Sequence, residues 1–499
     1  MKPAGEDLIL AIDVGTSGVK AGLVDASGKV SSVRRAGYPT RTVAGGGFIQ
    51  EPEDWWRALL ASARETLRQA RTAHVAGLVL SSQIGTHLLV TSAGDPLTEA
   101  VTWQDGRSIG DQLAIEQEFT RPRIAALIGI NLPSAASWPL PRLRWFEREH
   151  AAAFGQARYL FQPKEFLIHR LTGAVVGDSS SWRGLVNPST RSASGVLDAF
   201  GVSDLTVPIK EPTDVAGELR EEVADELGLE PKTPVFVGWN DLNCSLLGAG
   251  AIADGDAFDL GGTSEHVGVV IAMNRSDGFE PSAGAPLAME APFGSTDGLP
   301  RIARYGVSSN GGLVVEWCRS LAGSRSTAND IERLASTAPP GSNGVIFLPY
   351  IAGERAPVWN PDARGAFAGL TLRTTVHDFL RGALEGVAFN LRQIMEVVGP
   401  TAVGANVPIL TAGGPARMSL WNQIKADVFG RRVAVPREPE VGIGGAAMVA
   451  ATGLEWHSSL LAAARAMRPE LTFMDPEPQN TEIYESAYGR YLRLYPALK

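Results

Sequence analysis

Two segments of this 499-residue sequence place an aspartate just before a Gly-Thr-Ser turn. The first is Asp13 with residues 15–17, and the second is Asp259 with residues 262–264. Successive N–H groups in a tight turn form an anion-binding nest. The hydroxyls add hydrogen-bond donors, and a carboxylate beside the nest suits a hydrated Mg²⁺. Together these groups predict contacts to the terminal phosphates of a nucleotide, although one such turn alone would more simply be an ordinary β-hairpin.

Each turn joins two apolar segments that read as strands. Because the pattern recurs about half a chain apart, it predicts two similar domains that face one nucleotide. This arrangement resembles the superfold that sugar kinases, Hsp70 and actin share. The resemblance implies an α/β fold of two ribonuclease-H-like domains with a cleft between them. We expect the domains to span residues 1–248, with an insertion at about 108–200, and residues 249–499.

Asp241 stands where a general base would be useful. It follows the apolar strand 235–238 and opens a predicted helix of small and apolar residues. A carboxylate at such a strand end can accept the proton of a substrate hydroxyl. An Asp at this point can equally cap the N-terminus of the helix, which by itself is the simpler interpretation.

Polar residues at two further strand ends indicate a sugar site. Gln83 and Ile84 follow the predicted strand 75–80, and Trp103 and Asp105 follow another apolar segment. Ligands of open α/β sheets bind at the carboxyl ends of the strands. An aromatic face beside a carboxylate suits a sugar. The alternative is a Trp packed at a sheet edge next to a surface ion pair.

The second half of the sequence offers nucleotide contacts. Gly311 lies at a predicted helix start, where a phosphate or sugar can come close to the backbone. Gly414 and Pro415 follow the predicted strand 407–411, and this small-residue loop can admit a flat ring such as adenine. A long amphipathic helix is predicted at 376–398.

Composition excludes several classes of protein. The net charge is −9, and no basic cluster occurs, which disfavours nucleic acid and anionic membranes as partners. No apolar run approaches the ~20 residues of a membrane span. Two cysteines cannot form a zinc site and fit a reducing cytoplasm, which is the expected location.

With these motifs in order, the chain resembles the FGGY family of carbohydrate kinases over nearly its whole length, and within it the xylulokinase branch. The segments that resemble family motifs include D-V-G-T-S-G-V-K (13–20), Q-E-P-E-D-W-W (50–56), T-W-Q-D-G-R (102–107), P-K-E-F-L-I-H-R-L-T-G (163–173), N-D-L-N-C-S-L-L-G (240–248), G-G-T-S (261–264) and A-G-G-P-A-R (412–417). The strongest match runs from Phe347 to Leu370.

The resemblance implies MgATP as the phosphoryl donor and Asp241 as the catalytic base, with Asp13 organising the metal. The implied nucleotide and phosphate contacts are Asp13, Gly15, Thr16, Ser17, Lys20, Gly262, Thr263, Gly311, Gly414, Pro415 and Met418. The implied sugar contacts are Gln83, Ile84, Trp103, Asp105, Trp138 and Asn240. The expected partners are a small sugar and, as one alternative, a second copy of the chain.

The sequence departs from the family pattern at several of these positions. Asn240 replaces the usual Gly before the catalytic Asp, and residues 83–86 lack the Met-His pair of xylulokinases. Pro415 replaces a small residue of the adenine loop, and Met418 replaces an adenine-contacting Asn of glycerol kinases.

The implied reaction is phosphorylation of a pentulose, with D-xylulose first and D-ribulose next. Gluconate, glycerol and other polyols are alternatives, and Asp105 and Asp241 disfavour an acid such as gluconate. A non-kinase ATPase of the Hsp70 or actin type is the remaining alternative.

Overall fold

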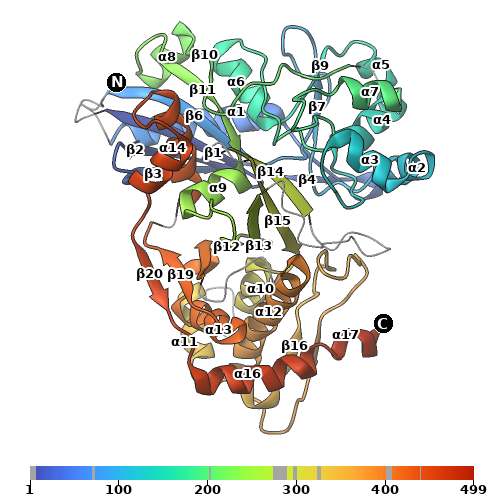
Figure 1. The fold of residues 1–499 in the computed structure, drawn as a ribbon, viewed down its shortest axis with the longest axis vertical. Helices are drawn as coiled ribbons and strands as arrows, with labels where there is room; N and C mark the ends of the chain where they lie inside the picture. The colour runs from blue at the N-terminus through green and yellow to red at the C-terminus, as the bar shows by residue number, and fades with distance from the viewer. Residues whose placement is uncertain are drawn as a thin grey trace. The chain divides into compact units, whose positions relative to one another are not determined.

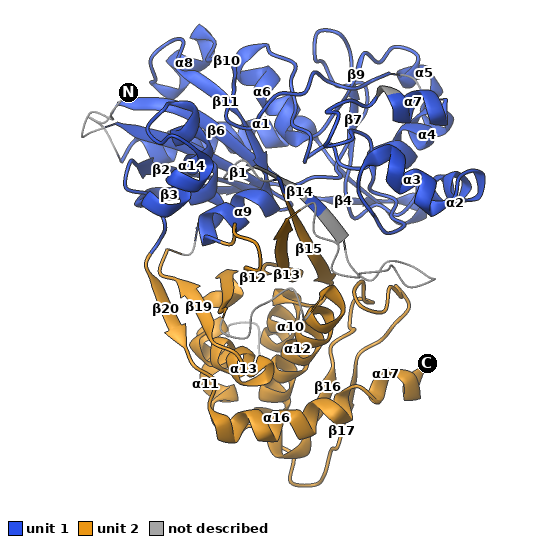
Figure 2. Cartoon of the chain, in the orientation of Figure 1, with its two compact units in different colours: residues 1–250, 291–300, 440–469 blue, residues 251–290, 301–439, 470–499 orange. Residues whose placement is uncertain are grey.

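The computed structural model describes residues 7–69, 74–201, 204–272, 289–295, 300–322, 327–399, 407–438 and 440–499. The chain divides into two compact units (Figure 2). Unit 1 comprises residues 1–250, 291–300 and 440–469, and unit 2 comprises residues 251–290, 301–439 and 470–499.

Unit 1 is built on a six-stranded sheet in the order β10-β11-β6-β1-β2-β3. Its strands are β1 (Leu8–Gly15), β2 (Gly18–Asp25), β3 (Val30–Gly37), β6 (Val75–Ser82), β10 (Val215–Glu218) and β11 (Pro234–Asn240). The pairs β1–β2 and β2–β3 are antiparallel, whereas β1–β6 and β6–β11 are parallel. The carboxyl ends of β1, β6 and β11 therefore meet at one edge of the sheet.

Smaller elements complete unit 1. Two small sheets contain β4 (Arg41–Val43), β5 (Gly47–Gln50) and β8 (Ala100–Val101), and β7 (Leu88–Val90) and β9 (Tyr159–Phe161). The helices are α1 (Pro52–Leu67), α2 (Ile109–Glu118), α3 (Arg121–Ile128), α4 (Pro139–Glu149), α5 (Ala151–Phe154), α6 (Pro163–Thr172), α7 (Ser194–Phe200), α8 (Glu221–Leu227), α9 (Asp241–Ala249), α14 (Val441–Gly453) and α15 (Leu460–Ala466).

The second large sheet has seven strands in the order β14-β15-β13-β12-β18-β19-β20. They are β12 (Ala257–Gly261), β13 (Glu265–Ala272), β14 (Met289–Ser295), β15 (Pro300–Ser308), β18 (Ile409–Gly413), β19 (Val433–Pro436) and β20 (Leu471–Met474). Unit 2 also contains β16 (Ile346–Leu348), β17 (Ala366–Ala368), α10 (Gly312–Ala322), α11 (Ala328–Ala335), α12 (Val376–Val398), α13 (Ser419–Phe429), α16 (Pro478–Tyr491) and α17 (Leu494–Leu498).

The predicted internal repeat is present in the strand pairing. In the second sheet, β12–β13 and β13–β15 are antiparallel, and β12–β18 and β18–β19 are parallel. The first sheet has the same pattern. There β1–β2 and β2–β3 are antiparallel, and β1–β6 and β6–β11 are parallel. Each predicted phosphate turn connects the first two strands of its sheet, so the α/β repeat expected from the two turns is confirmed.

The sequence predicted one domain boundary, between residues 248 and 249. In the structure the chain also returns to unit 1 at residues 440–469. Helix α14 packs along α9 (Figure 1). A Cβ at Gly248 would lie 1.9 Å from the Val441 carbonyl oxygen, and one at Gly445 would lie 1.8 Å from that of Cys244. Only glycine permits this backbone approach. Nothing local in the sequence of α14 identifies α9 as its partner.

No helix in the described part of the chain has the length and apolarity that a bilayer crossing requires.

Candidate active site

Two carboxylates lie at the edge of the first sheet where its parallel strands end. Asp13 of β1 pairs in register with Ser81 of β6, which pairs with Trp239 of β11. Asp241 follows directly as the first residue of α9. The Ser81 hydroxyl donates to Asp13 Oδ1 at 3.2 Å. Strand pairing and the start of α9 thus bring the predicted metal-organising group and the predicted base to the same edge of the sheet.

The electrostatics of this pair suit acid–base chemistry. Burial raises the pKa of Asp241 to about 7, and the negative charge of Asp13 adds to the rise. The Leu242 N–H, 2.8 Å from Asp241 Oδ1, and the charge of Arg183 act in the opposite direction. Burial also raises the pKa of Asp13, opposed in part by Lys20 and by the Ser81 hydroxyl. A carboxyl that titrates near neutral pH can take up a substrate proton and release it again.

The first Gly-Thr-Ser turn is held in place from several sides. Gln50 Nε2 donates to the Thr16 carbonyl oxygen at 2.8 Å, and Trp103 Nε1 donates to Thr16 Oγ1 at 3.0 Å. Arg35 donates to Ser17 Oγ at 2.6 Å, and the Tyr38 hydroxyl donates to the Gly15 carbonyl oxygen. Trp103, predicted as a sugar contact, therefore braces the phosphate turn with its indole N–H.

The start of α14 completes the surroundings of Asp13. Lys20 forms an ion pair with Glu440 at 2.7 Å, and Glu440 is the residue that precedes α14. A Cβ at Gly442 would lie 3.7 Å from Asp13 Oδ2, so the first turn of α14 faces the carboxylate. Lys20 is thereby engaged by protein and acts on Asp13 through its charge.

Gln83 and Ile84 follow β6 directly. The Gln83 side chain is 2% exposed and its Nε2 donates to Gln50 Oε1 at 3.3 Å, while its Oε1 accepts no hydrogen bond from the described residues. Gln50 thus links Gln83 to the turn at Thr16. Ile84 is half-buried beside it.

Asp105 does not have the role that the sequence predicted. Its carboxylate is fully buried, pairs with Arg107 at 2.7 Å and with Arg142 at 3.8 Å, and accepts the Phe48 N–H at 2.9 Å. Burial alone would raise the pKa of Asp105, but the hydrogen bonds from Arg107 bring it below its ordinary value. Since these groups occupy both oxygens, Asp105 is an internal ion-pair residue rather than a sugar contact. The alternative interpretation expected an ion pair at the surface, whereas Asp105 and Arg142 are both buried.

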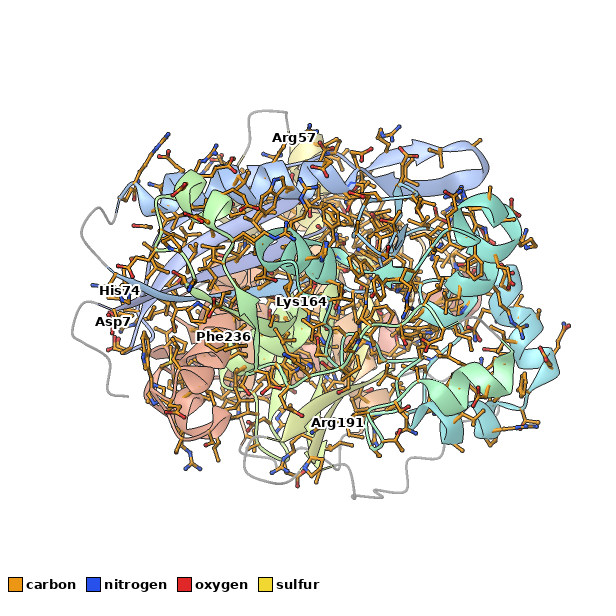
Figure 3. The ribbon with its side chains drawn as sticks, turned by 90° about the horizontal axis from the view of Figure 1, so that it is seen from above. Asp7, Arg57, His74, Lys164, Arg191 and Phe236 are labelled. Atoms are coloured by element: carbon orange, nitrogen blue, oxygen red, sulfur yellow. The ribbon has the colours of Figure 1, made fainter. Side chains whose placement is uncertain are left out.

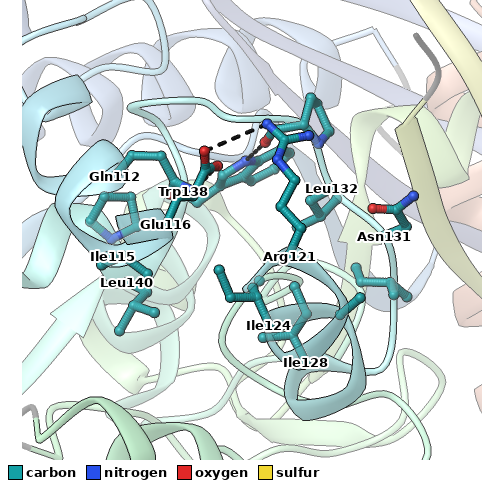
Figure 4. A pocket seen from close by; sticks show the side chains of 15 residues that line it. Gln112, Ile115, Glu116, Arg121, Ile124, Ile128, Asn131, Leu132, Trp138 and Leu140 are labelled. Atoms are coloured by element: carbon teal, nitrogen blue, oxygen red, sulfur yellow. Dashed lines mark hydrogen bonds and ion pairs between the residues drawn. The ribbon is translucent and has the colours of Figure 1, made fainter. Parts of the chain in front are cut away.

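Trp138 lies before α4 and lines a pocket in the insertion of unit 1 (Figure 4). Its Nε1 donates to the Pro133 carbonyl oxygen at 2.8 Å, and the Arg183 guanidinium lies 5.6 Å from its ring centroid. The pocket has apolar walls from Ile115, Ile124 and Ile128, and an ion pair of Arg121 with Glu116 at its rim. Arg183, whose charge acts on Asp241, thus also contacts the ring of Trp138.

Asn240 is also not a sugar contact, since its side chain is fully buried and both ends are bound by protein. Its Oδ1 accepts the Asn243 N–H at 2.9 Å, which caps α9, and its Nδ2 donates to Ser180 Oγ at 3.2 Å. The alternative interpretation, that Asp241 is the cap, is wrong because Asn240 is the cap. Asp241 is left with one bond to its own helix.

The second turn lies in unit 2, with Gly262 and Thr263 exposed. The start of α10 packs on it: the Gly312 N–H donates to Gly262 and the Leu313 N–H to Thr263, at 2.9 and 3.1 Å. A Cβ at Gly311 would lie 2.8 Å from that of Glu265, so this position has no room for a side chain. The turn and the helix start form one rigid, backbone-lined surface.

The aspartate of the second turn differs from Asp13. Asp259 is buried and pairs with Lys425 at 2.6 Å, and Lys425 also contacts the buried Glu265. Because Lys425 neutralises its charge inside the protein, Asp13 is the one of the two turn aspartates that could organise a metal. No group of three or more metal-ligating side chains occurs among the described residues. A single carboxylate fits a Mg²⁺ that keeps most of its waters.

The predicted adenine loop has an exposed Gly414 that nothing contacts within 4 Å of its Cβ position. Pro415 packs on Gly261. Met418 is 3% exposed and belongs to the core of unit 2, so its side chain offers little surface to a ring.

Four residues of this site were not singled out from the sequence: Gln50, Ser81, Ser180 and Arg183. Gln50 begins the Q-E-P-E-D-W-W motif, and Ser180 and Arg183 lie in the polar loop that starts at Asp178. The motifs pointed to the segments, but the contacts join residues far apart in the sequence.

Comparisons with known proteins identify the family of the chain. The model of the FGGY family of carbohydrate kinases, N-terminal domain, matches residues 8–248, and that of the C-terminal domain matches residues 261–454. The chain therefore belongs to the FGGY family of carbohydrate kinases, and it has that family's two-domain α/β fold.

The similar proteins include both gluconokinases and xylulose kinases. The chain is 29% identical to a gluconokinase of Bacillus subtilis, over 88% of this chain and 86% of the relative. It is 26% identical to a xylulose kinase of the same organism, over 98% and 97%. Among solved structures, a xylulose kinase from Lactobacillus acidophilus has a TM-score of 0.87, with 26% identity over 99% and 98% of the two chains. A gluconate kinase from the same species has a TM-score of 0.86, with 26% identity over 99% and 98%.

Proposed function

We propose that this kinase transfers the γ-phosphoryl group of ATP to a hydroxyl of a small sugar, with Asp241 as the general base. The observation that carries the proposal is the placement of Asp241 at the first residue of α9, beside Asp13, with a pKa of about 7. Such a carboxylate is ionised often enough at neutral pH to accept the hydroxyl proton as the phosphoryl group moves.

The remaining groups position the reactants. The N–H groups and hydroxyls of the turns at Thr16 and Thr263 suit phosphate oxygens, and Gly311, Gly414 and Pro415 suit a nucleotide that approaches the backbone. Asp13 would hold Mg²⁺ through water, and when bound the ion neutralises phosphate charge. Gln83 Oε1 is available to accept a sugar hydroxyl. The ATPase alternative of the Hsp70 or actin type has no support from the family match.

We propose a pentulose as substrate, with D-xylulose first. Xylulose kinases are similar to this chain over almost the whole length of both proteins. Gluconate is the second candidate, supported by the gluconokinase similarity and by one feature of the site. Asp105 and Asp241 were the two reasons to disfavour an acid, and of these the charge of Asp105 is balanced by Arg107 and Arg142.

A coupled assay that follows ADP release with D-xylulose, D-ribulose, D-gluconate and glycerol tests this proposal. We expect the highest kcat/KM with D-xylulose. A tenfold preference for gluconate would reject the pentulose and keep the kinase, whereas ATP turnover that no sugar or polyol stimulates would reject the kinase. The cytoplasmic location and the homodimer stay predictions.

A further inference from the structure

A fully buried ionic cluster lies behind the strand end that leads to Asp241. Lys164 of α6 pairs with Asp178 at 2.7 Å and lies 3.8 Å from Glu165, and all three side chains are at most 1% exposed. Figure 3 labels Lys164 and, for comparison, Arg57, whose side chain is 71% exposed. Burial alone would lower the pKa of Lys164, but Asp178 raises it above its ordinary value. The Lys164–Asp178 pair is therefore charged, because Lys164 also brings the pKa of Asp178 below its ordinary value, whereas burial raises the pKa of Glu165.

The Asp178 carboxylate also organises two serines. Asp178 Oδ1 accepts the Ser180 hydroxyl at 2.6 Å, and Oδ2 accepts the Ser181 hydroxyl at 2.5 Å. Both backbone N–H groups donate to Oδ1 as well, at 3.0 and 2.9 Å. The two serines are 3% and 4% exposed. Each serine thus donates its hydroxyl to the Asp178 carboxylate. Of the two hydroxyls, the one of Ser180 also contacts Asn240.

The cluster holds the end of β11 by its backbone. The pairing of β11 with β6 shifts between Phe236 and Trp239, and this bulge leaves the residues between them out of the ladder. Lys164 Nζ donates to the Val237 carbonyl oxygen at 3.2 Å. Gly238 has φ +69°, and a Cβ there would lie 1.9 Å from the Leu80 carbonyl oxygen. The bulge requires glycine, and the lysine satisfies the oxygen that the bulge frees.

The cluster also holds the start of α9, through Asn240. The Ser180 hydroxyl gives its proton to Asp178, so it accepts from Asn240 Nδ2. The other end of the same amide, Oδ1, must face the Asn243 N–H. The orientation of the amide is thus fixed by its two partners. One side chain connects the buried ions to the cap of the helix whose first residue is Asp241.

We propose that Asn240 is a positioning residue for the catalytic carboxylate, which it holds in place by linking the helix cap to Ser180 and the Lys164–Asp178 pair. This inference rests on the proposed function of Asp241. Asn240 touches no reactant, because it is fully buried and bound at both ends. Asn240 instead fixes the orientation of Asp241, the residue that follows it. Positioning matters because a base contributes only when it reaches the proton that it abstracts.

The test compares Ser180→Ala with Ser181→Ala. Each change removes one hydroxyl bond to Asp178 at a buried site, but only the first removes the acceptor of Asn240. Asn240→Ser keeps an oxygen that can cap the helix and is too short to reach Ser180. We expect kcat to fall about tenfold in Ser180→Ala and Asn240→Ser, part of the roughly 10²–10⁴ that a base contributes. We expect less than a twofold change in Ser181→Ala, and KM values for sugar and ATP within about twofold of wild type in all three.

Two further readouts separate positioning from stability. The double variant Ser180→Ala/Asn240→Ser should be no slower than either single variant, because both break the same link. The acid limb of the kcat–pH profile should move in these variants and stay in Ser181→Ala. Equal losses of kcat in the two serine variants, or multiplied losses in the double variant, would overturn the inference.

Asp241→Asn tells the two proposals apart. If it loses nearly all turnover while the serine variants behave alike, the base stands and the positioning role fails. If it keeps more than about a tenth of wild-type turnover, Asp241 is not the base and the positioning role falls with it.

Discussion

Replacement of Asp241, the proposed general base, should make the protein more stable while removing its activity. The pKa of Asp241 is raised from 3.8 to about 7 by burial and by Asp13. A carboxyl with a raised pKa favours the folded state only while it is protonated. Its contribution is complete below the unfolded pKa near 4 and is lost as the pH rises through 7. Above pH 7 the folded protein carries the full cost of the charge, so Asp241→Asn should stabilise unit 1 there.

The magnitude follows from the size of the shift. About three pKa units correspond to about 4 kcal/mol. Because Asp241 is only half-buried, water screens the charge, and we expect about 1–2 kcal/mol for the free energy of unfolding at pH 8. Asparagine keeps the acceptor for the Leu242 N–H, so the comparison isolates the charge.

Denaturant unfolding of wild type and Asp241→Asn at pH 5, 6, 7 and 8 measures this effect. The difference in midpoint should be small at pH 5 and grow to its full size at pH 8. Asp225→Asn, an exposed change on α8, is the control and should show no such trend. A constant difference between pH 5 and pH 8, or a less stable Asp241→Asn at pH 8, would refute the reasoning.

Three further outcomes follow from the same geometry. Turnover at saturating substrate should fall about tenfold from pH 8 to pH 6 as Asp241 with its pKa of about 7 takes up a proton, which a pH-rate profile measures; a flat profile would contradict this role. Asp13→Ala should raise the Mg²⁺ concentration for half-maximal activity, with partial recovery at high Mg²⁺ or with Mn²⁺, and an unchanged metal titration would exclude Asp13. Gly238→Ala should lower the free energy of unfolding by about 2–4 kcal/mol, because its Cβ would collide with the Leu80 carbonyl and its φ is positive; unchanged denaturant unfolding would show that the bulge relaxes.

The repeat and its two turns could be predicted from the sequence because their signals are local. Asp13 and Asp259 each precede a Gly-Thr-Ser turn between apolar strands, and both turns join the first two strands of their sheets. The long helix predicted at 376–398 has those bounds in the structure. These features depend on residues that are close in the sequence, so the hydrophobic pattern and the turn residues were enough to predict them.

The predictions that changed depend on contacts between distant residues. Asp105 is balanced by Arg142, 37 positions later, and Asn240 is held by Ser180, 60 positions earlier. An acid or an amide at a strand end has the same sequence pattern whether its partner is a ligand or a buried side chain. Likewise, nothing local in the glycine-rich start of α14 identifies α9 as the helix on which it packs.

The packing of α14 against α9 also has a consequence for synthesis on the ribosome. Ala249 ends α9 and Val441 begins α14, 192 positions later in the chain. At about 5–20 residues per second, the second helix emerges roughly 10–40 s after the first. During that interval the side of α9 that carries Gly248 has no α14 to pack against. Residues 1–250 of unit 1 are thus synthesised first, but unit 1 can complete its packing only after residues 440–469 have been translated.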